Sequence, residues 1–400
     1  MIEILKPADA AQVAETLAWA TGEEVPLEIV GTGSKRGFGR PMGEGNRIVG
    51  HALDLSALTG ITLYEPEELV LTAKAGTPVA EIEAAVAAKG QQLAFEPPDL
   101  SVLYGTSGGT LGGLVSVNLG GPRRFKAGAA RDHVLGIEGV SGRGEAFKAG
   151  GRVVKNVTGY DLCKIVSGAH GTLAALTEIT IKVLPAPEET RTLAGRQAGR
   201  QAGTRASTQA TGSRQEVPGA AHWPARGGTP AETLIRLEGF GPSVAARSAA
   251  LRDLLGGFGT IDERDDAASL ALWRSVRDAR LVAGGGGPLW RVSLTPSDAP
   301  GFVAAVCAAV EASAVYDWAG GLVWLVVAES SADAGAAAVR GALAAHGGGH
   351  ATLIRAPEAV RAAVDVFEPQ PAPVAALTRR VKDGFDPRRI LNPGRMYAGV

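Results

Sequence analysis

The sequence predicts an α+β protein made of two modules, with a boundary near residue 187. Three observations lead to this fold class. Three glycine-rich segments interrupt strand and helix patterns in the first module, Pro185-Ala186-Pro187 ends those patterns, and a second alternation of strands and helices begins near Glu232. We expect the second alternation to form an antiparallel sheet with helices packed on it.

The first module shows two clear helix patterns. Residues 9–19 are amphipathic, and Asp9 is a residue type that caps helix N-termini. Residues 78–89 begin with proline, which is favoured in a first helical turn, and Gly90 ends them. Apolar runs predict strands at residues 25–30, 70–74, 134–140 and 177–184.

A glycine-rich loop follows the apolar run 25–30 directly and reads Gly31-Thr32-Gly33-Ser34-Lys35-Arg36-Gly37. Glycine lets the backbone approach a ligand closely, and successive N–H groups can then form a concave anion site. Lys35 and Arg36 add positive charge, so the loop is suited to phosphate. A Rossmann fingerprint does not fit, because the third glycine comes one residue late and Pro41 follows.

Two further glycine-rich segments strengthen this interpretation. The second runs from Gly105 to Gly121, and we expect a short helix to begin near Thr110 with its free N–H groups available to an anion. The third contains Gly168-Ala169-His170-Gly171-Thr172. Three such loops in one module indicate a long, extended ligand rather than a single phosphate.

The order of these motifs resembles the FAD-binding domain of the vanillyl-alcohol oxidase (PCMH-type) superfamily. The similarity covers residues 1 to 187, in the segments "AGTPVAEIEAAVAAKG", "EPPD", "TSGGTLGGLVSVNLGG", "RDHVLGIEGV" and "SGAHGTLAALTEITIKVLP". Near the C-terminus, Lys382-Asp383-Gly384-Phe385-Asp386-Pro387 and Leu391-Asn392-Pro393-Gly394-Arg395 resemble the closing motif of that family. The resemblance implies a two-subdomain FAD-binding domain, an antiparallel cap domain, and a tail that returns to the FAD-binding domain.

The resemblance also implies FAD as the cofactor and assigns residues to it. The first glycine loop lacks the histidine that tethers the flavin in some relatives, so we expect noncovalent FAD. No metal site is assigned. The expected cofactor-binding residues are Gly31, Thr32, Gly33, Ser34, Lys35, Gly37, Pro97, Gly108, Gly109, Thr110, Gly112, Gly113, Asn118, Gly168, His170, Gly171, Ile179 and Asn392.

Two segments, "GGRVVKNVTGYDLCKIVSGAHGTL" and "GGGHATLIRAPEAVR", resemble the shorter FAD-binding subunits of bacterial glycolate oxidases. This implies a subunit that oxidises glycolate, a small 2-hydroxy acid, together with a larger FAD-linked subunit and an iron–sulfur subunit. The chain has two cysteines, Cys163 and Cys307, too few for an all-cysteine cluster of its own. The alternatives are a free-standing FAD-dependent D-2-hydroxy-acid dehydrogenase and a non-catalytic flavin-containing scaffold.

The residues for catalysis are less clear. Catalytic relatives carry histidine motifs that are missing here from the cap strand Gly321–Leu325. A 2-hydroxy acid needs a cation for its carboxylate and a base for its hydroxyl proton. His346, His350 and Arg355 are the expected catalytic residues, with a solvent-exposed loop as the alternative.

Composition excludes several other classes of function. Aromatic residues make up only 5% of the chain and the net charge is −1, so no stacking platform or basic patch for nucleic acid is present. No apolar run reaches the roughly 18 residues of a membrane-spanning helix. We therefore expect a cytoplasmic protein, or one bound peripherally at the inner membrane through its complex.

Residues 188–230 differ from the rest because large apolar side chains are nearly missing and Gly, Arg, Gln, Ser and Thr dominate. Such composition predicts a disordered insertion. Residues 231–375 are expected to form the cap domain and residues 376–400 the returning tail. Within the cap, periodicity predicts strands at 233–238, 289–294 and 321–328 and helices at 243–255, 302–312 and 332–345.

Overall fold

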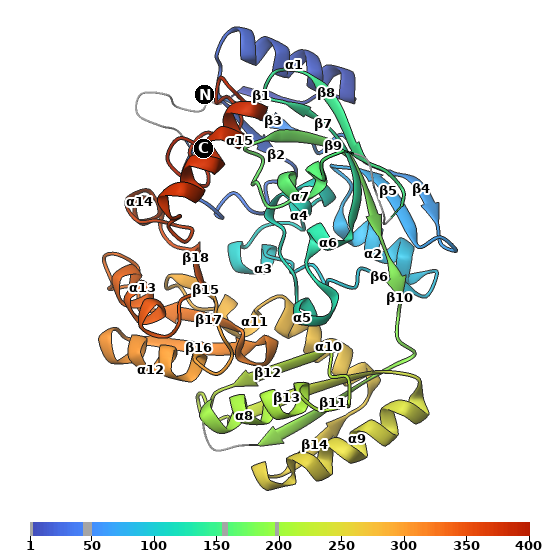
Figure 1. Cartoon of the computed structure of the whole chain (residues 1–400), viewed down its shortest axis with the longest axis vertical. Coiled ribbons are helices and arrows are strands. Elements are labelled where there is room, and N and C mark those ends of the chain that lie inside the picture. Colours follow the sequence, from blue (N-terminus) through green and yellow to red (C-terminus); the bar gives the residue numbers. More distant parts are fainter. Residues whose placement is uncertain (1–2, 43–49, 154–158, 197–199) are drawn as a thin grey trace. The chain divides into compact units, whose positions relative to one another are not determined.

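The computed structural model describes residues 3–42, 50–153, 159–196 and 200–400 (Figure 1). The chain divides into two compact units, of which unit 1 comprises residues 1–120, 128–186 and 365–400. Unit 2 comprises residues 121–127 and 187–364. In the described ranges, no helix is both long and apolar enough to cross a membrane.

Unit 1 begins with a small parallel sheet in the order β1-β3-β2, formed by Glu3–Leu5, His51–Asp54 and Leu27–Val30. Helix α1 (Ala10–Gly22) confirms the first helix prediction. Asp9 caps it, because its carboxylate accepts a hydrogen bond of 2.9 Å from the Gln12 N–H. The helix buries Val13 and Leu17 against Leu27 and Leu53. This packing holds the end of β2, from which the first glycine loop leaves.

A five-stranded antiparallel sheet forms the rest of unit 1, in the order β4-β5-β9-β7-β8. These strands are Ile61–Glu65, Val70–Lys74, Ala174–Lys182, Val134–Ser141 and Ala146–Gly150. Its apolar face packs against helices α2 (Val79–Ala87) and α4 (Leu111–Val117) through residues such as Ile82, Leu111 and Ile179. The smaller elements are β6 (Gln91–Gln92), β10 (Leu184–Pro185), α3 (Ser101–Tyr104), α6 (Ala130–His133) and α7 (Leu162–Val166).

The C-terminal segment packs on unit 1, as expected. Helix α15 (Ala372–Phe385) leads into an extended stretch beside β2. The Leu27 N–H donates to the Ile390 carbonyl at 2.7 Å, and the Asn392 N–H donates to the Leu27 carbonyl at 3.0 Å. The tail therefore extends the parallel sheet at the point where the first glycine loop begins.

Unit 2 contains an eight-stranded antiparallel sheet in the order β14-β11-β13-β12-β16-β17-β15-β18, which confirms the antiparallel prediction. In that order the strands are Ile261–Arg264, Glu189–Arg196, Glu232–Gly239, Gly219–Trp223, Ala312–Asp317, Leu322–Val327, Leu289–Ser293 and His350–Arg355. Its helices are α5 (Arg124–Ala127), α8 (Arg200–Thr211), α9 (Gly241–Leu255), α10 (Asp266–Arg277), α11 (Arg280–Ala283), α12 (Ala299–Ala309), α13 (Ala336–Ala345) and α14 (Glu358–Ala363), with short 3₁₀ turns at Gly256–Phe258 and Trp318–Gly320.

The expected disordered insertion at residues 188–230 is wrong. This segment supplies β11, α8 and β12, and β11 and β12 pair with β13 on its two sides. Ala206 and Ala210 of α8 are fully buried in a core that includes Leu193 and Val217. Small residues let the helix lie close to the sheet, so the segment buries surface without large apolar side chains.

Candidate functional site

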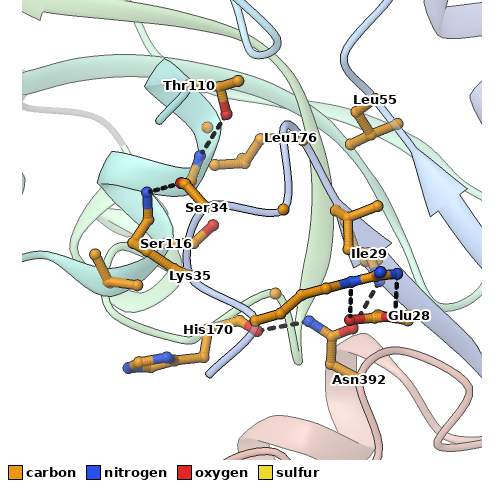
Figure 2. A pocket seen from close by; sticks show the side chains of 18 of the residues that line it. Glu28, Ile29, Ser34, Lys35, Leu55, Thr110, Ser116, His170, Leu176 and Asn392 are labelled. Carbon is orange, nitrogen blue, oxygen red and sulfur yellow. Dashed lines mark hydrogen bonds and ion pairs between the residues drawn. The ribbon is translucent and has the colours of Figure 1, made fainter. Parts of the chain in front are cut away.

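A pocket with about 800 Å³ of empty volume, part of it open to solvent, lies in unit 1 beyond the end of β2 (Figure 2). The first glycine loop, helix α4, the third glycine loop and the C-terminal tail all line it. The sequence-predicted residues in the lining are Gly31, Thr32, Gly33, Ser34, Lys35, Thr110, Gly112, Gly113, His170, Gly171 and Asn392.

The first glycine loop offers backbone donors. Gly33 has φ +72°, in the left-handed region that favours glycine, and the Arg36 N–H donates to its carbonyl at 3.2 Å. The N–H groups of Thr32, Gly33, Ser34 and Lys35 have no acceptor within the described parts of the chain. Successive backbone donors of this kind form an anion-binding concavity.

Lys35 brings a buried cation to the same loop. Its Nζ lies 3.1 Å from the Ser34 hydroxyl, and a Cβ placed on Gly109 would come within 2.6 Å of it. Burial lowers the pKa of Lys35 to about 8, and the Asp99 carboxylate opposes this shift only in part. An ammonium group that is destabilised by burial is stabilised when an anion binds beside it.

Arg36 does not share this role, which corrects the expectation from the loop sequence. Its guanidinium makes a bidentate ion pair with Glu28, at 2.9 Å for Nε and 2.6 Å for Nη2 (Figure 2). Glu28 is buried in the second position of β2. The pair neutralises both charges, so Lys35 is the cation that this loop presents to the pocket.

The second glycine loop meets the first, but the start of α4 is not an anion site as expected. Thr110 caps the helix, and its hydroxyl accepts the Gly113 N–H at 3.3 Å. The N–H groups of Leu111 and Gly112 donate to the carbonyls of Thr77 and Ala75 at 2.9 and 2.7 Å. The first donors of this helix are therefore occupied within the protein.

The glycines of these two loops allow close contact between segments. A Cβ on Gly31 would lie 2.6 Å from the Thr110 hydroxyl, and one on Gly112 would lie 3.0 Å from the Ala75 Cβ. The Thr32 hydroxyl donates to the Gly108 carbonyl at 2.8 Å. Part of the glycine pattern therefore serves loop packing, which in turn shapes the wall of the pocket.

Asn392 joins the tail to the third glycine loop and to β2. Its Oδ1 accepts the Ile29 N–H at 2.7 Å, and its Nδ2 donates to the His170 carbonyl at 2.7 Å (Figure 2). A Cβ on Gly171 would come within 2.6 Å of Nδ2. Asn392 thus holds two walls of the pocket together with both ends of its amide.

His170 lies against two aromatic rings. The ring centroids of Phe38 and Phe367 are each 4.9 Å from its imidazole. Burial lowers the pKa of His170 to about 3, and the positive charge of Arg395 adds to the effect. The imidazole is therefore neutral at physiological pH and acts as an aromatic, polarisable wall.

Other predicted cofactor residues lie outside this pocket lining: Gly37, Pro97, Gly108, Gly109, Asn118, Gly168 and Ile179. Ile179 is fully buried in the core of the five-stranded sheet. Asn118 ends α4 with φ +49°, and its Oδ1 accepts the Arg131 N–H at 2.8 Å. A Cβ on Gly37 would meet the ring of Tyr104 at 2.8 Å. Asn118 thus fixes the end of α4, the helix that lines the pocket.

Sequence reasoning missed several residues of the lining, among them Glu28, Ser116 and Arg395. Arg395 donates to the carbonyls of Lys35 and Arg36 at 3.2 and 3.1 Å, so the tail also holds the first loop in place. Its position in the closing motif was the available signal. Ser116 lies on a helix whose sequence is otherwise apolar or glycine, and its carbonyl accepts the His170 N–H at 2.9 Å.

The three expected catalytic residues do not form one cluster. His350 begins β18 and Arg355 ends it, so about 17 Å of strand separates them. Arg355 donates to the carbonyls of Ala283, Val282, Gly285 and Gly287 and thereby fixes the loop before β15. The His346 ring lies at the end of α13, with Nδ1 2.8 Å from the Ala342 carbonyl. Arg355 is therefore a structural residue, and the grouping is wrong.

Comparison with known proteins shows which sequences this chain is similar to. A family described as "FAD binding domain" matches residues 3–150. The glycolate oxidase subunit GlcE of Escherichia coli (strain K12) is 36% identical over 399 residues, which cover 99% of each chain. The glycolate oxidase subunit GlcD of Bacillus subtilis (strain 168) is 32% identical over 190 residues, 48% of this chain and 38% of its own length.

Solved structures agree on the fold. Substrate-bound p-cresol methylhydroxylase superposes with a TM-score of 0.71 at 14% identity, covering 99% of this chain and 88% of its own. The 4-ethylphenol oxidase of Gulosibacter chungangensis gives a TM-score of 0.69 at 12% identity, covering 99% and 89%.

The chain therefore contains an FAD-binding domain, and it shares its fold, including a large antiparallel cap sheet, with p-cresol methylhydroxylase. Because the similarity to a GlcE subunit spans the full length, the chain belongs to the GlcE family of glycolate oxidase subunits.

Proposed function

We propose that the chain is the FAD-binding subunit of a complex that oxidises a small 2-hydroxy acid, glycolate, to the 2-oxo acid glyoxylate. The observation that carries the proposal is the match to a glycolate oxidase subunit over 99% of both chains, with a glycine-lined pocket in the matching unit. Its partners in the proposal are a larger FAD-linked subunit and an iron–sulfur subunit. The second relative, a GlcD subunit, is consistent with a larger flavin subunit of related sequence.

The residues of the pocket fit FAD. The N–H groups of Thr32 to Lys35, which meet no acceptor among the described residues, and the Lys35 ammonium suit a pyrophosphate. Glycine at 31, 33, 112 and 171 keeps the wall thin enough for an extended ligand. The neutral His170 and its aromatic neighbours suit the packing of a flat ring system. When bound, a flavin supplies the two-electron acceptor that amino acid side chains lack.

We propose that FAD is held without a covalent bond. Among the lining residues of the pocket, His170 is the one nucleophilic ring, and its edge-to-face contacts with Phe38 and Phe367 restrain it. Cys163 is buried in the sheet core, and Cys307 belongs to unit 2. Acid precipitation should therefore release all of the yellow chromophore into the supernatant, and chromophore left on the precipitate would contradict noncovalent binding.

The test is to co-express the tagged chain with its two partner subunits and to measure flavin, iron and glycolate-dependent reduction of an artificial acceptor. We expect activity in the assembled complex and little or none in the isolated chain. Efficient glycolate oxidation by the isolated chain would support a free-standing dehydrogenase instead. Full activity of a complex that carries a flavin-free form of this chain would support a scaffold.

A further inference from the structure

One face of the unit 2 sheet carries a row of polar and aromatic side chains. Arg291 on β15 stands directly opposite Trp324 on β17 and Thr352 on β18, and Ser293 stands opposite His350. Directly paired residues and residues two apart on a strand share a face of the sheet. These five side chains therefore lie on the same face.

The opposite face is covered by helix α13. Arg340 of this helix stacks on Trp290, with 5.4 Å from its guanidinium carbon to the ring centroid. The Trp290 indole N–H donates to the Ala334 carbonyl at 2.7 Å, just before the helix. Trp290 and Arg291 are neighbours on β15 and point to opposite faces, so Arg291 lies on the face away from α13.

The guanidinium of Arg291 is held between two tryptophans. Its carbon lies 4.9 Å from the ring centroid of Trp318 and 5.9 Å from that of Trp324. Trp318 is itself fixed, because its indole N–H donates to the Gly121 carbonyl at 2.9 Å. No hydrogen bond or ion pair from the described residues reaches the guanidinium, although this group carries five N–H donors.

Two charged side chains lie close enough to act on the Arg291 guanidinium. Burial lowers the pKa of Arg291 to about 10, the Asp317 carboxylate raises it, and Arg124 lowers it further. Arg291 therefore stays protonated at neutral pH. The Asp317 carboxylate also accepts the Trp318 N–H at 2.7 Å.

We propose that Arg291, with Trp318 and Trp324 beside it, binds the carboxylate of a small organic acid on this face of unit 2. A guanidinium matches a carboxylate through two parallel N–H bonds, and stacking between aromatic rings orients it in advance. The inference rests on the proposed function for the identity of the acid, a 2-hydroxy acid such as glycolate. His350 shares the face, so the structure groups this predicted residue with Arg291 rather than with Arg355.

The test is calorimetric titration of the purified full-length, flavin-containing chain with glycolate and with oxalate. Ethylene glycol, which lacks a carboxylate, serves as the neutral probe. We expect the two acids to bind and the neutral probe not to bind. Arg291→Gln should weaken the binding of both acids at least about tenfold, because it removes a charge-assisted pair. Arg291→Lys should bind with intermediate affinity, since it keeps the charge and loses the fork.

Arg340→Gln is the matched control, because it removes the other stacked arginine from the opposite face. It should leave acid binding unchanged, and unchanged thermal midpoints would show that all variants are folded. Three outcomes would overturn the inference. The Arg291→Gln protein could bind the acids with the affinity of the wild type, the Arg340→Gln protein could lose as much affinity as the Arg291→Gln protein, or the wild type could bind neither acid. The outcome is separable from the proposed function: acid binding through Arg291 stands even if the complex does not oxidise glycolate, and turnover can persist without this site.

Discussion

Lys382 and Asp386 form an ion pair with 2.7 Å between Nζ and Oδ2, and neither side chain is exposed to solvent. The Lys382 ammonium also donates to the carbonyls of Thr172 and Leu391 at 2.7 and 2.9 Å. The Asp386 carboxylate accepts the N–H groups of Ile390 and Leu391 at 3.1 and 2.8 Å. The pair thus joins helix α15, the third glycine loop and the tail, which carries Asn392 and Arg395 to the pocket.

Lys382→Met should destabilise unit 1 strongly, because it leaves the Asp386 carboxylate buried without a counter-charge. Breaking a buried pair on one side costs about 3–5 kcal/mol. Denaturant unfolding followed by flavin release measures the loss. Arg388 lies in the same tail and forms an exposed ion pair with Glu24. Arg388→Ala removes this pair and should lower the free energy of unfolding by less than about 1 kcal/mol. Equal effects of the two substitutions would show that the buried pair does not hold the tail.

Much of the fold follows from local patterns in the sequence. Residues 70–74 form β5 as predicted, and the predicted helices at 9–19 and 243–255 correspond to α1 and α9 with ends that differ by no more than three residues. These elements have a clear apolar period or a capping residue, which local sequence records.

The walls of the pocket could be predicted only in part. The first loop was recognisable because three closely spaced glycines follow a strand. The pairing of Arg36 with Glu28 and the contacts of Asn392 with Ile29 and His170 were not, because partners that are separated in the sequence leave no local pattern. For the same reason Arg291 went unnoticed: its tryptophan neighbours are on two other elements.

Gly33→Val should reduce the retention of FAD. Gly33 has φ +72°, and a non-glycine residue in this region costs about 1–2 kcal/mol, more when β-branched. The strain would turn the N–H groups of Thr32 to Lys35 away from the pocket. We expect a loss of affinity of about tenfold or more, measured by flavin content after gel filtration and by titration of the apoprotein.

The control for this substitution is Gly341→Val, at a position on α13 where an added Cβ meets nothing within 4 Å and φ is ordinary. It should keep the flavin content of the wild type. If Gly33→Val also keeps it, the first loop is a turn with no part in cofactor binding.

FAD affinity should depend on pH through Lys35. In the flavin-free protein its pKa is lowered to about 8, and a bound phosphate would raise it. Below pH 8 both forms are protonated and affinity is constant. As pH rises above about 8, binding takes up a proton and affinity falls, by at most about tenfold per pH unit. Titration of the apoprotein between pH 6.5 and 9.5, an interval of about three units, measures this slope.

Lys35→Met should weaken FAD binding at neutral pH and remove the pH dependence. Lys89→Met, at an exposed position after α2, should change neither. An unchanged slope in Lys35→Met would assign the titration to another group and exclude Lys35 as the phosphate ligand.

The segment that was expected to be disordered shows why composition misleads there. Residues 200–211 contain Ala, Gly, Thr, Gln and Arg but no large apolar residue, so the composition predicts that little of this segment is buried. In the structure Ala206 and Ala210 are fully buried, and Thr204 and Ser207 are nearly so. Burial of one small side chain contributes little to the free energy of folding. The close approach of several of them to β12 and β13 adds dispersion contacts that composition alone does not predict.

Gly203→Val tests this packing directly. A Cβ on Gly203 would come within 2.1 Å of His222 Nδ1, and His222 is buried with its ring nitrogen 2.9 Å from the Thr233 hydroxyl. The His222 ring cannot move without breaking that contact, so we expect unit 2 to lose about 1–3 kcal/mol of stability, or more, from overpacking. Tryptophan fluorescence during urea unfolding reports on unit 2 through Trp273 and Trp290, both fully buried. Gly257→Val, where an added Cβ meets nothing within 4 Å, should leave the unfolding midpoint unchanged. If the Gly203→Val protein is as stable as the Gly257→Val protein, residues 200–211 do not pack closely on the sheet.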